Sequence, residues 1–389
     1  MPARWLLPLL AIALRVGVAL ADPHVEFDVR VMFAMRRALL EHGLHAYGDV
    51  PEWVYPPGLM PWLLIGTWLA DHLGISREFA LRLPSILADG ALTFLVMAAL
   101  ESKRTERGLV IVAGSLVAFG PMFVAVSSYQ GQIDTLAVLP AAVAALVWGG
   151  TTRPSRAVVC GLLIGIGAAL KTVPIFVTLA LLPTACSWRE RASLVMTTAA
   201  VPALMLLPFL AVDPGGAGRV FQYAGLPGLG GWSVLIQPSL TRSWLLREPF
   251  DIARSTQFLY LCGAVASLIG LVLVTLLLIR RRTPPLAAAP VVWLTVYALA
   301  VGFFPQYTTW ALPFFLMAGR IRESAILSAL LMPITVIVVL PRPLSLSGLV
   351  PVYQAFAVAM QLFFVVMWVR SLVATDPDGF RTPPNPPAV

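Results

Sequence analysis

The chain has 389 residues, of which 59% are hydrophobic and 12% are charged, and its mean hydropathy is +0.85. Soluble domains carry roughly 25% charged residues, so the composition excludes an ordinary soluble protein. The formal net charge of +8 comes from arginines spread over short polar segments, which excludes the continuous basic patch of a nucleic-acid-binding protein.

Apolar runs of bilayer length follow one another along the chain and predict an all-α polytopic membrane protein. Short cytoplasmic loops are enriched in Lys and Arg, and one threading with about twelve spans places these clusters and both termini on the cytoplasmic side. The expected spans are residues 5–21, 83–100, 109–126, 135–148, 157–170, 172–186, 194–211, 258–279, 286–304, 309–318, 325–340 and 350–369. Residues 1–372 then form one transmembrane domain, and residues 373–389 are expected to be a disordered cytoplasmic tail.

Two long external loops interrupt this pattern, over residues 22–82 and 212–257. In the first loop, apolar residues and basic residues of the segment 27–40 each recur at helical spacing and so form two separate stripes. This pattern predicts an amphipathic helix that lies flat on the outer leaflet. Its apolar stripe consists of Phe27, Val31, Met35 and Ala38. Residues 58–70 are apolar but shorter than a span, so we expect a re-entrant segment there.

Asp28 stands at the start of the predicted amphipathic helix, shortly after the first span. A carboxylate at this position can stabilise the N-terminus of the helix. It can also serve as a general base near the membrane surface, where Asp22 and Glu26 are alternatives.

Further polar groups lie at the predicted external ends of the spans. Tyr55 precedes two prolines at the start of the re-entrant segment, where proline alone can explain a helix start. Gln132 and Asp134 lie in the turn between the third and fourth spans. Their side chains can hydrogen-bond sugar hydroxyls, although Asp134 can also simply cap the helix that follows.

Lys171 separates two short apolar runs, where a lysine is unfavourable unless it reaches water or an anion. It can therefore extend to the interface or bind a phosphate as a point charge. Gln306 and Tyr307 lie in a later external turn. An aromatic belt at the interface explains Tyr307, but both side chains can also line a site.

Arg15 and Asp89 are charged residues inside predicted spans. Arg15 lies seven residues before Asp22, and Asp89 lies seven residues after Arg82. Both are therefore about 10 Å below the external face. Equal depth on consecutive spans predicts a structural ion pair that neutralises both charges.

Taken in order, these motifs resemble the GT-C superfamily of integral-membrane glycosyltransferases, and most closely its hexosyltransferases that use polyprenyl-phosphate-linked sugars. The resemblance rests on the aspartate after the first span, Tyr55-Pro56-Pro57, Arg82-Leu83-Pro84 with Asp89, Gly131-Gln132-Ile133-Asp134, Ala169-Leu170-Lys171 and Pro305-Gln306-Tyr307. It implies that Asp28 is the catalytic base. It also implies that donor and substrate are bound by Glu26, Tyr55, Arg82, Gln132, Asp134, Lys171, Gln306 and Tyr307.

The resemblance further implies inverting transfer of a hexose, with mannose as the expected sugar, to a lipid, glycan or protein acceptor at the external face during assembly of a cell-envelope glycan. The leaving phosphate needs a cation, for which Lys171 and an external arginine are candidates. These arginines are Arg82, Arg219 and Arg342. Some relatives have two aspartates separated by one residue, whereas this chain has Glu26-Phe27-Asp28, which leaves a requirement for a divalent metal open.

Two alternative functions stay open on the sequence alone, a transporter and a non-catalytic subunit. A lipid or sugar transporter has a similar number of spans, but we find no internal repeat of the kind common in transporters. A non-catalytic subunit of a glycan-assembly complex would share the architecture of the enzyme but not its chemistry.

Overall fold

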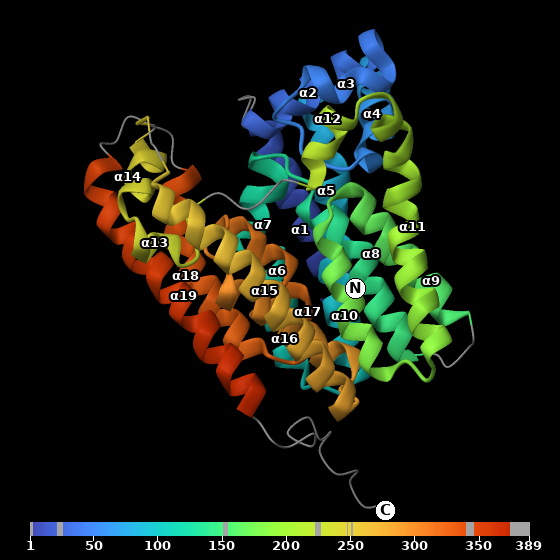
Figure 1. Cartoon of the computed structure of the whole chain (residues 1–389), viewed down its shortest axis with the longest axis vertical. Coiled ribbons are helices and arrows are strands. Elements are labelled where there is room, and N and C mark those ends of the chain that lie inside the picture. The colour runs from blue at the N-terminus through green and yellow to red at the C-terminus, as the bar shows by residue number, and fades with distance from the viewer. Residues whose placement is uncertain are drawn as a thin grey trace, which may run out of the picture. The chain divides into compact units, whose positions relative to one another are not determined.

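The computed structural model describes residues 3–21, 26–150, 155–221, 227–246, 248–249, 252–339 and 346–373, and every regular element in these segments is a helix (Figure 1). The chain groups into two compact units. The first contains Met1–Met97, Ile111–Thr178 and Cys186–Ala224, and the second contains Ala98–Val110, Leu179–Ala185 and Gly225–Val389. Asp22, Arg342 and residues 374–389, for which we made predictions above, lie outside the described residues.

The described helices include seven that are long and apolar enough to cross a membrane. They are Arg4–Ala21, Arg77–Ser102, Arg107–Tyr129, Trp188–Val212, Arg254–Arg281, Ile321–Val338 and Val350–Val373. Shorter apolar helices cover Asp134–Gly150, Arg156–Leu170, Val173–Thr184 and Pro285–Leu299. The chain is therefore a multi-pass membrane protein, while the total of about twelve spans stays a prediction.

Helices that lie wholly or mostly in the first unit carry most of the polar residues singled out above, and Gln306 and Tyr307 belong to the second unit. In chain order the helices of the first unit are α1 (Ala3–Ala21), α2 (Phe27–His42), η1 (Gly43–His45), α3 (Ala46–Asp49), η2 (Pro57–Leu59), α4 (Met60–Leu73), α5 (Arg77–Ser102), α6 (Arg107–Ala118), α7 (Pro121–Val124), the π-helical segment η3 (Ala125–Tyr129), α8 (Asp134–Gly150), α9 (Arg156–Leu170), η4 (Val173–Ile175), α11 (Trp188–Val212), α12 (Pro214–Gly218) and η6 (Arg219–Phe221).

The predicted amphipathic helix is present as α2, but protein covers its apolar face. Val29, Met32 and Met35 are buried in one cluster with side chains from α3, α4 and α12, and these short helices lie together at one end of the unit (Figure 1). Phe27, which the sequence pattern placed on the apolar stripe, is 54% exposed. The expectation that this stripe rests on lipid is therefore wrong, because α3 and α4 of the first loop and α12 of the second loop pack against it.

Close packing around α9 brings together the ends of three segments. A side chain at Gly167 would come within 2.3 Å of the Ala137 carbonyl oxygen on α8, and one at Gly58 would come within 2.4 Å of the Ala169 carbonyl oxygen. Only glycine permits such approaches. The C-terminal end of α9, the first turns of α8 and the Tyr55-Pro56-Pro57-Gly58 segment consequently meet around Lys171.

The core of the second unit includes an aromatic cluster at α16 (Pro285–Leu299), on which Tyr297 stacks against Phe364 with ring centroids 4.8 Å apart. Its other helices are η5 (Leu182–Thr184), α13 (Ser233–Ile236), α14 (Ser239–Leu246), α15 (Arg254–Arg281), η7 (Pro305–Trp310), α17 (Leu312–Met317), α18 (Ile321–Val339), η8 (Leu346–Leu349) and α19 (Val350–Val373). Helix α10 (Phe176–Leu181) is divided between the two units.

Candidate functional site

Asp28 lies in the first turn of α2, where two residues distant in sequence hold its carboxylate. The Gln132 Nε2 atom donates a hydrogen bond to Asp28 Oδ2 at 2.9 Å, and the Tyr55 hydroxyl donates to Asp28 Oδ1 at 3.4 Å. The half-buried side chain is thus fixed from both sides. Tertiary contacts therefore orient the Asp28 carboxylate, as a reacting group requires. This holds even if the same carboxylate also stabilises the N-terminus of α2.

The surroundings of Asp28 raise its pKa above the ordinary aspartate value. Loss of hydration is the largest cause, and the Asp134 carboxylate adds to it. The hydrogen bond from Gln132, the positive charge of Lys171 and the Tyr55 hydroxyl act in the opposite direction. A carboxylate with a raised pKa is a stronger base than one in water, so Asp28 is suited to accept a proton.

Lys171 and Asp134 form a buried ion pair next to this carboxylate. The Lys171 Nζ atom donates to Asp134 Oδ1 at 2.6 Å, with side-chain exposures of 6% and 0%. The same Nζ atom lies 5.4 Å from the centroid of the Tyr55 ring. Tyr55 therefore touches both Asp28 and Lys171, and the five residues Asp28, Tyr55, Gln132, Asp134 and Lys171 form one cluster.

The turn that carries Gln132 depends on a glycine. Gly131 has a φ of +72°, a conformation that side-chain-bearing residues rarely adopt. A Cβ atom there would come within 2.6 Å of Val29 Cγ2 and 3.2 Å of Arg82 Cγ. The turn is thus pressed against α2 beside Asp28 and against the buried side chain of Arg82, whose Nη1 atom donates to the Ala19 carbonyl at 3.4 Å.

Tyr55 is held by a second layer of residues. The Tyr47 hydroxyl donates to the Tyr55 carbonyl oxygen at 2.7 Å, and the Trp53 ring meets the Tyr55 ring edge-on at 5.3 Å. Arg219 of η6 in turn donates to the Tyr47 carbonyl oxygen. Arg219, one of the arginines proposed to face phosphate, is therefore linked to the cluster through Tyr47.

Three of the predicted site residues lie apart from these contacts. The Glu26 carboxylate makes no hydrogen bond or ion pair within the segments that the structure describes. Gln306 and Tyr307 belong to the second unit. Tyr307 is 5% exposed, stacks on Trp310 at 4.0 Å and accepts a hydrogen bond from Tyr297 through its carbonyl.

A metal site is not evident around Asp28. Among the residues placed by the structure, no group of three or more His, Cys, Asp or Glu side chains is arranged to hold a metal ion. Asp28 and Asp134 instead face an amide, a hydroxyl and an ammonium group.

Residues 53–230 match the profile of glycosyltransferase family 87. The chain is a glycosyltransferase, and over this segment, a little under half of its length, it is similar to family 87. The match confirms the resemblance to integral-membrane glycosyltransferases of the GT-C type and decides for an enzyme over a transporter or a non-catalytic subunit. The comparison with curated proteins finds no match for this chain. The matched segment contains Tyr55, Gln132, Asp134 and Lys171, and Asp28 precedes it.

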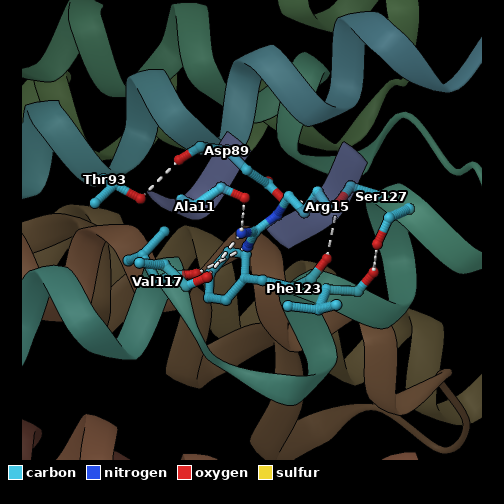
Figure 2. A network of polar contacts seen from close by, with 10 residues as sticks. Ala11, Arg15, Asp89, Thr93, Val117, Phe123 and Ser127 are labelled. Carbon is cyan, nitrogen blue, oxygen red and sulfur yellow. Dashed lines mark hydrogen bonds and ion pairs between the residues drawn. The ribbon is translucent and has the colours of Figure 1, made fainter. Parts of the chain in front are cut away.

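The glycosyltransferase contains a second buried polar network deeper in the first unit (Figure 2). Arg15 on α1 forms an ion pair with Asp89 on α5, and both side chains are 0% exposed. The guanidinium also donates to the carbonyls of Ala11, Val117 and Ala118 at 3.0, 2.9 and 2.7 Å. The structure thus brings together the two residues that equal depth had suggested as a pair.

One residue of these networks carried little signal in the glycosyltransferase sequence. Ser127 sits in an apolar run and donates to Asp89 Oδ2 at 2.7 Å. A hydroxyl in an apolar run can bond back to its own helix, so the sequence gives no sign that this side chain has a long-range partner.

Proposed function

We propose that this glycosyltransferase transfers a hexose, with mannose as the first candidate, from a polyprenyl-phosphate donor to a hydroxyl of a lipid, glycan or protein acceptor. The observation that carries the proposal is Asp28, a carboxylate of raised pKa held by Gln132 and Tyr55 directly after a membrane-spanning helix. A base at the end of a span suits a donor whose lipid tail is held in the bilayer, because confinement to the membrane favours proximity.

The reaction proposed for Asp28 is a single displacement with inversion. Asp28 takes the proton of the acceptor hydroxyl while the acceptor oxygen forms a bond to the anomeric carbon. The bond between this carbon and the phosphate oxygen breaks, and polyprenyl phosphate leaves with the electron pair. A positioned base contributes about 10²–10⁴-fold to such a rate.

Lys171 is the cation that we assign to the leaving phosphate. It is buried close enough to Asp28 for its charge to lower the pKa of that carboxyl, and positive charge near a developing phosphate stabilises the transition state. An ammonium group has three N–H donors, so its bond to Asp134 is compatible with a contact to phosphate. Gln132 and Asp134 are the side chains that we expect to bind sugar hydroxyls.

The orientation proposed for the enzyme follows the basic clusters of the sequence. They place both termini in the cytoplasm and the Asp28 cluster at the external face. A site-directed cysteine scan with an impermeant thiol reagent would test this orientation.

The test of the function is transfer of radiolabelled mannose from polyprenyl-phosphate mannose by the purified enzyme in proteoliposomes. We expect Asp28→Asn to lower the rate about 10²–10⁴-fold. Asp71→Asn is the matched control, because Asp71 is an exposed carboxylate paired with Arg77 outside the cluster, and it should transfer at the wild-type rate. Near-normal transfer by Asp28→Asn would overturn the assignment of the base, and transfer from a nucleotide sugar alone would overturn the donor class.

Loss of activity in Asp28→Asn must be separated from loss of folding. Because the folded state raises the pKa of Asp28, this group favours folding at low pH and loses that contribution as pH rises through its folded pKa. Asparagine cannot ionise, so the variant should melt at the wild-type temperature or slightly above it at neutral pH. A marked fall in melting temperature would instead attribute the lost activity to unfolding.

A further inference from the structure

The segment between α6 and α8 departs from regular helical geometry at two places. The first is the end of α6, where the Arg15 side chain bonds the backbone. Pro121 has no N–H group, so the carbonyls at the end of α6 lack their usual partners. Arg15 supplies donors to two of them, the carbonyls of Val117 and Ala118. The buried guanidinium therefore fixes the end of α6 as well as pairing with Asp89.

The second irregular stretch is η3, a single π-helical turn over Ala125–Tyr129. Such turns occur often at functional sites. The backbone N–H of Gln130 donates to the Ala125 carbonyl at 2.8 Å, and that of Gln132 donates to the Val126 carbonyl at 2.9 Å. The turn that presents Gln132 to Asp28 is thus bonded directly to the carbonyls of η3.

Ser127, in the middle of η3, joins this turn to the ion pair. Its Oγ atom lies 2.7 Å from Asp89 Oδ2 and 2.9 Å from the Phe123 carbonyl oxygen. A hydroxyl has one proton, and donation to the carboxylate is the stronger of the two options because the acceptor is charged. Asp89 Oδ2 therefore receives both Arg15 and Ser127, all three side chains being fully buried (Figure 2).

We propose that Arg15, Asp89 and Ser127 are positioning residues of the enzyme, which hold η3 so that the following turn places Gln132 against the base Asp28. The route is continuous: the ion pair fixes the end of α6 and the hydroxyl of Ser127, η3 carries the turn, and Gln132 bonds Asp28. This inference rests on the proposed function of Asp28 and adds to it a network inside the membrane-spanning part of the unit.

The test compares two deletions of a buried hydroxyl near Asp89. Ser127→Ala removes the link to η3 but leaves the ion pair in place. Thr93→Val is the matched control, because the Thr93 hydroxyl donates at 2.8 Å to the backbone carbonyl of Asp89 and forms no hydrogen bond with η3 among the described residues. We expect Ser127→Ala to lower kcat about 3- to 10-fold with little change in KM, since displacement of a positioned group slows the chemical step, and Thr93→Val to keep the wild-type kcat.

A double variant tests whether Ser127 acts through Gln132. If it does, adding Ser127→Ala to Gln132→Leu should cause no further loss, whereas independent effects would multiply. Ser127→Thr keeps a hydroxyl at this position and should restore kcat. Full multiplication in the double variant, or equal kinetics in Ser127→Ala and Thr93→Val, would overturn the proposal.

A second readout needs no sugar donor. N,N′-dicyclohexylcarbodiimide modifies protonated carboxyls, so labelling of the Asp28 peptide against pH, read by mass spectrometry, reports protonation of this residue. The groups facing Asp28 are Gln132, Lys171, Asp134 and Tyr55, and loss of the Gln132 contact removes the strongest interaction that lowers its pKa. Ser127→Ala should therefore be labelled up to a higher pH than wild type, and Thr93→Val should not.

The two proposals fail in different ways. An active Asp28→Asn enzyme would end the role of Asp28 as base, yet the labelling shift would still measure whether Ser127 positions Gln132. Conversely, wild-type labelling of Ser127→Ala beside an inactive Asp28→Asn would remove the positioning network and leave the base intact.

Discussion

Arg15–Asp89 and Lys171–Asp134 are both buried in the first unit, but the two ion pairs are built differently. Arg15 has a planar, five-donor guanidinium, and its bonds to Asp89 and to three backbone carbonyls fix it in one arrangement. Lys171 is a compact point charge next to the Tyr55 ring and the Asp28 carboxylate. Burial alone therefore does not assign a role to a charged side chain. The type of cation and its neighbours do: Arg15 is bonded to backbone carbonyls, whereas Lys171 lies where an anionic group of a substrate can reach it.

The largest expected effect comes from breaking the Arg15 pair. Asp89→Ala leaves a fully buried guanidinium without its counter-charge, and such a change costs about 3–5 kcal/mol of stability. The measurement is thermal unfolding of the purified enzyme in nanodiscs, with exposed Asp71→Ala as control. An Asp89→Ala protein as stable as wild type would show that the pair does not hold the unit together.

Replacing both members of that pair sharpens the comparison. Arg15→Met with Asp89→Leu exchanges the charges for apolar volume, which often restores most of the stability of a broken pair. We expect this double variant to fold but to transfer sugar slowly, because Ser127 has lost the Asp89 carboxylate and keeps only the carbonyl of Phe123 as acceptor. Wild-type kcat in a stable double variant would assign the pair to folding alone.

We expect the Lys171–Asp134 pair to matter for catalysis more than for folding. Removing both of its charges should leave the protein folded but should lower the rate of sugar transfer strongly. Lys171→Met with Asp134→Leu removes one positive and one negative charge together, and Asp28 keeps its bonds from Gln132 and Tyr55, so the protein should fold. Transfer should still fall by about 10²–10³-fold, the usual loss when one electrostatic group at a transition state is removed. Steady-state kinetics with polyprenyl-phosphate mannose measure this, and a rate within threefold of wild type would show that Lys171 does not serve the leaving phosphate.

The arrangement of helices follows from the sequence more fully than the contacts between them. Apolar runs and regular helical rise were sufficient to suggest Arg15 and Asp89 as partners, because residues at equal depth on neighbouring spans can meet. The face of α2 was also readable from its spacing, with Phe27 as the exception. What covers that face was not, since periodicity identifies an apolar stripe without saying whether lipid or protein meets it.

The site itself was only partly readable for a related reason. Asp28, Gln132, Asp134 and Lys171 stood out because polar groups in an apolar chain are rare. Ser127 did not stand out, because its importance comes from a π-helical turn that shifts the register of the residues after it. Tyr307 did stand out, but the structure gives it aromatic packing partners in the second unit, which order along the chain cannot reveal.

The smallest of the expected effects concerns Gln132, which follows η3 in the chain and bonds Asp28. Gln132→Leu keeps the side-chain volume but removes the hydrogen bond to Asp28, so kcat should fall about 10-fold, as for loss of a bond to a charged group.

Transfer requires ionised Asp28 and therefore declines as pH falls through its pKa. Since the Gln132 bond lowers this pKa, the variant should lose activity at a higher pH than wild type and recover part of it in alkaline buffer. A pH–rate profile of kcat measures the shift, with Thr93→Val as the control. An unchanged acid limb would show that Gln132 does not hold the base, and the Arg15 network would then have no path to the chemistry.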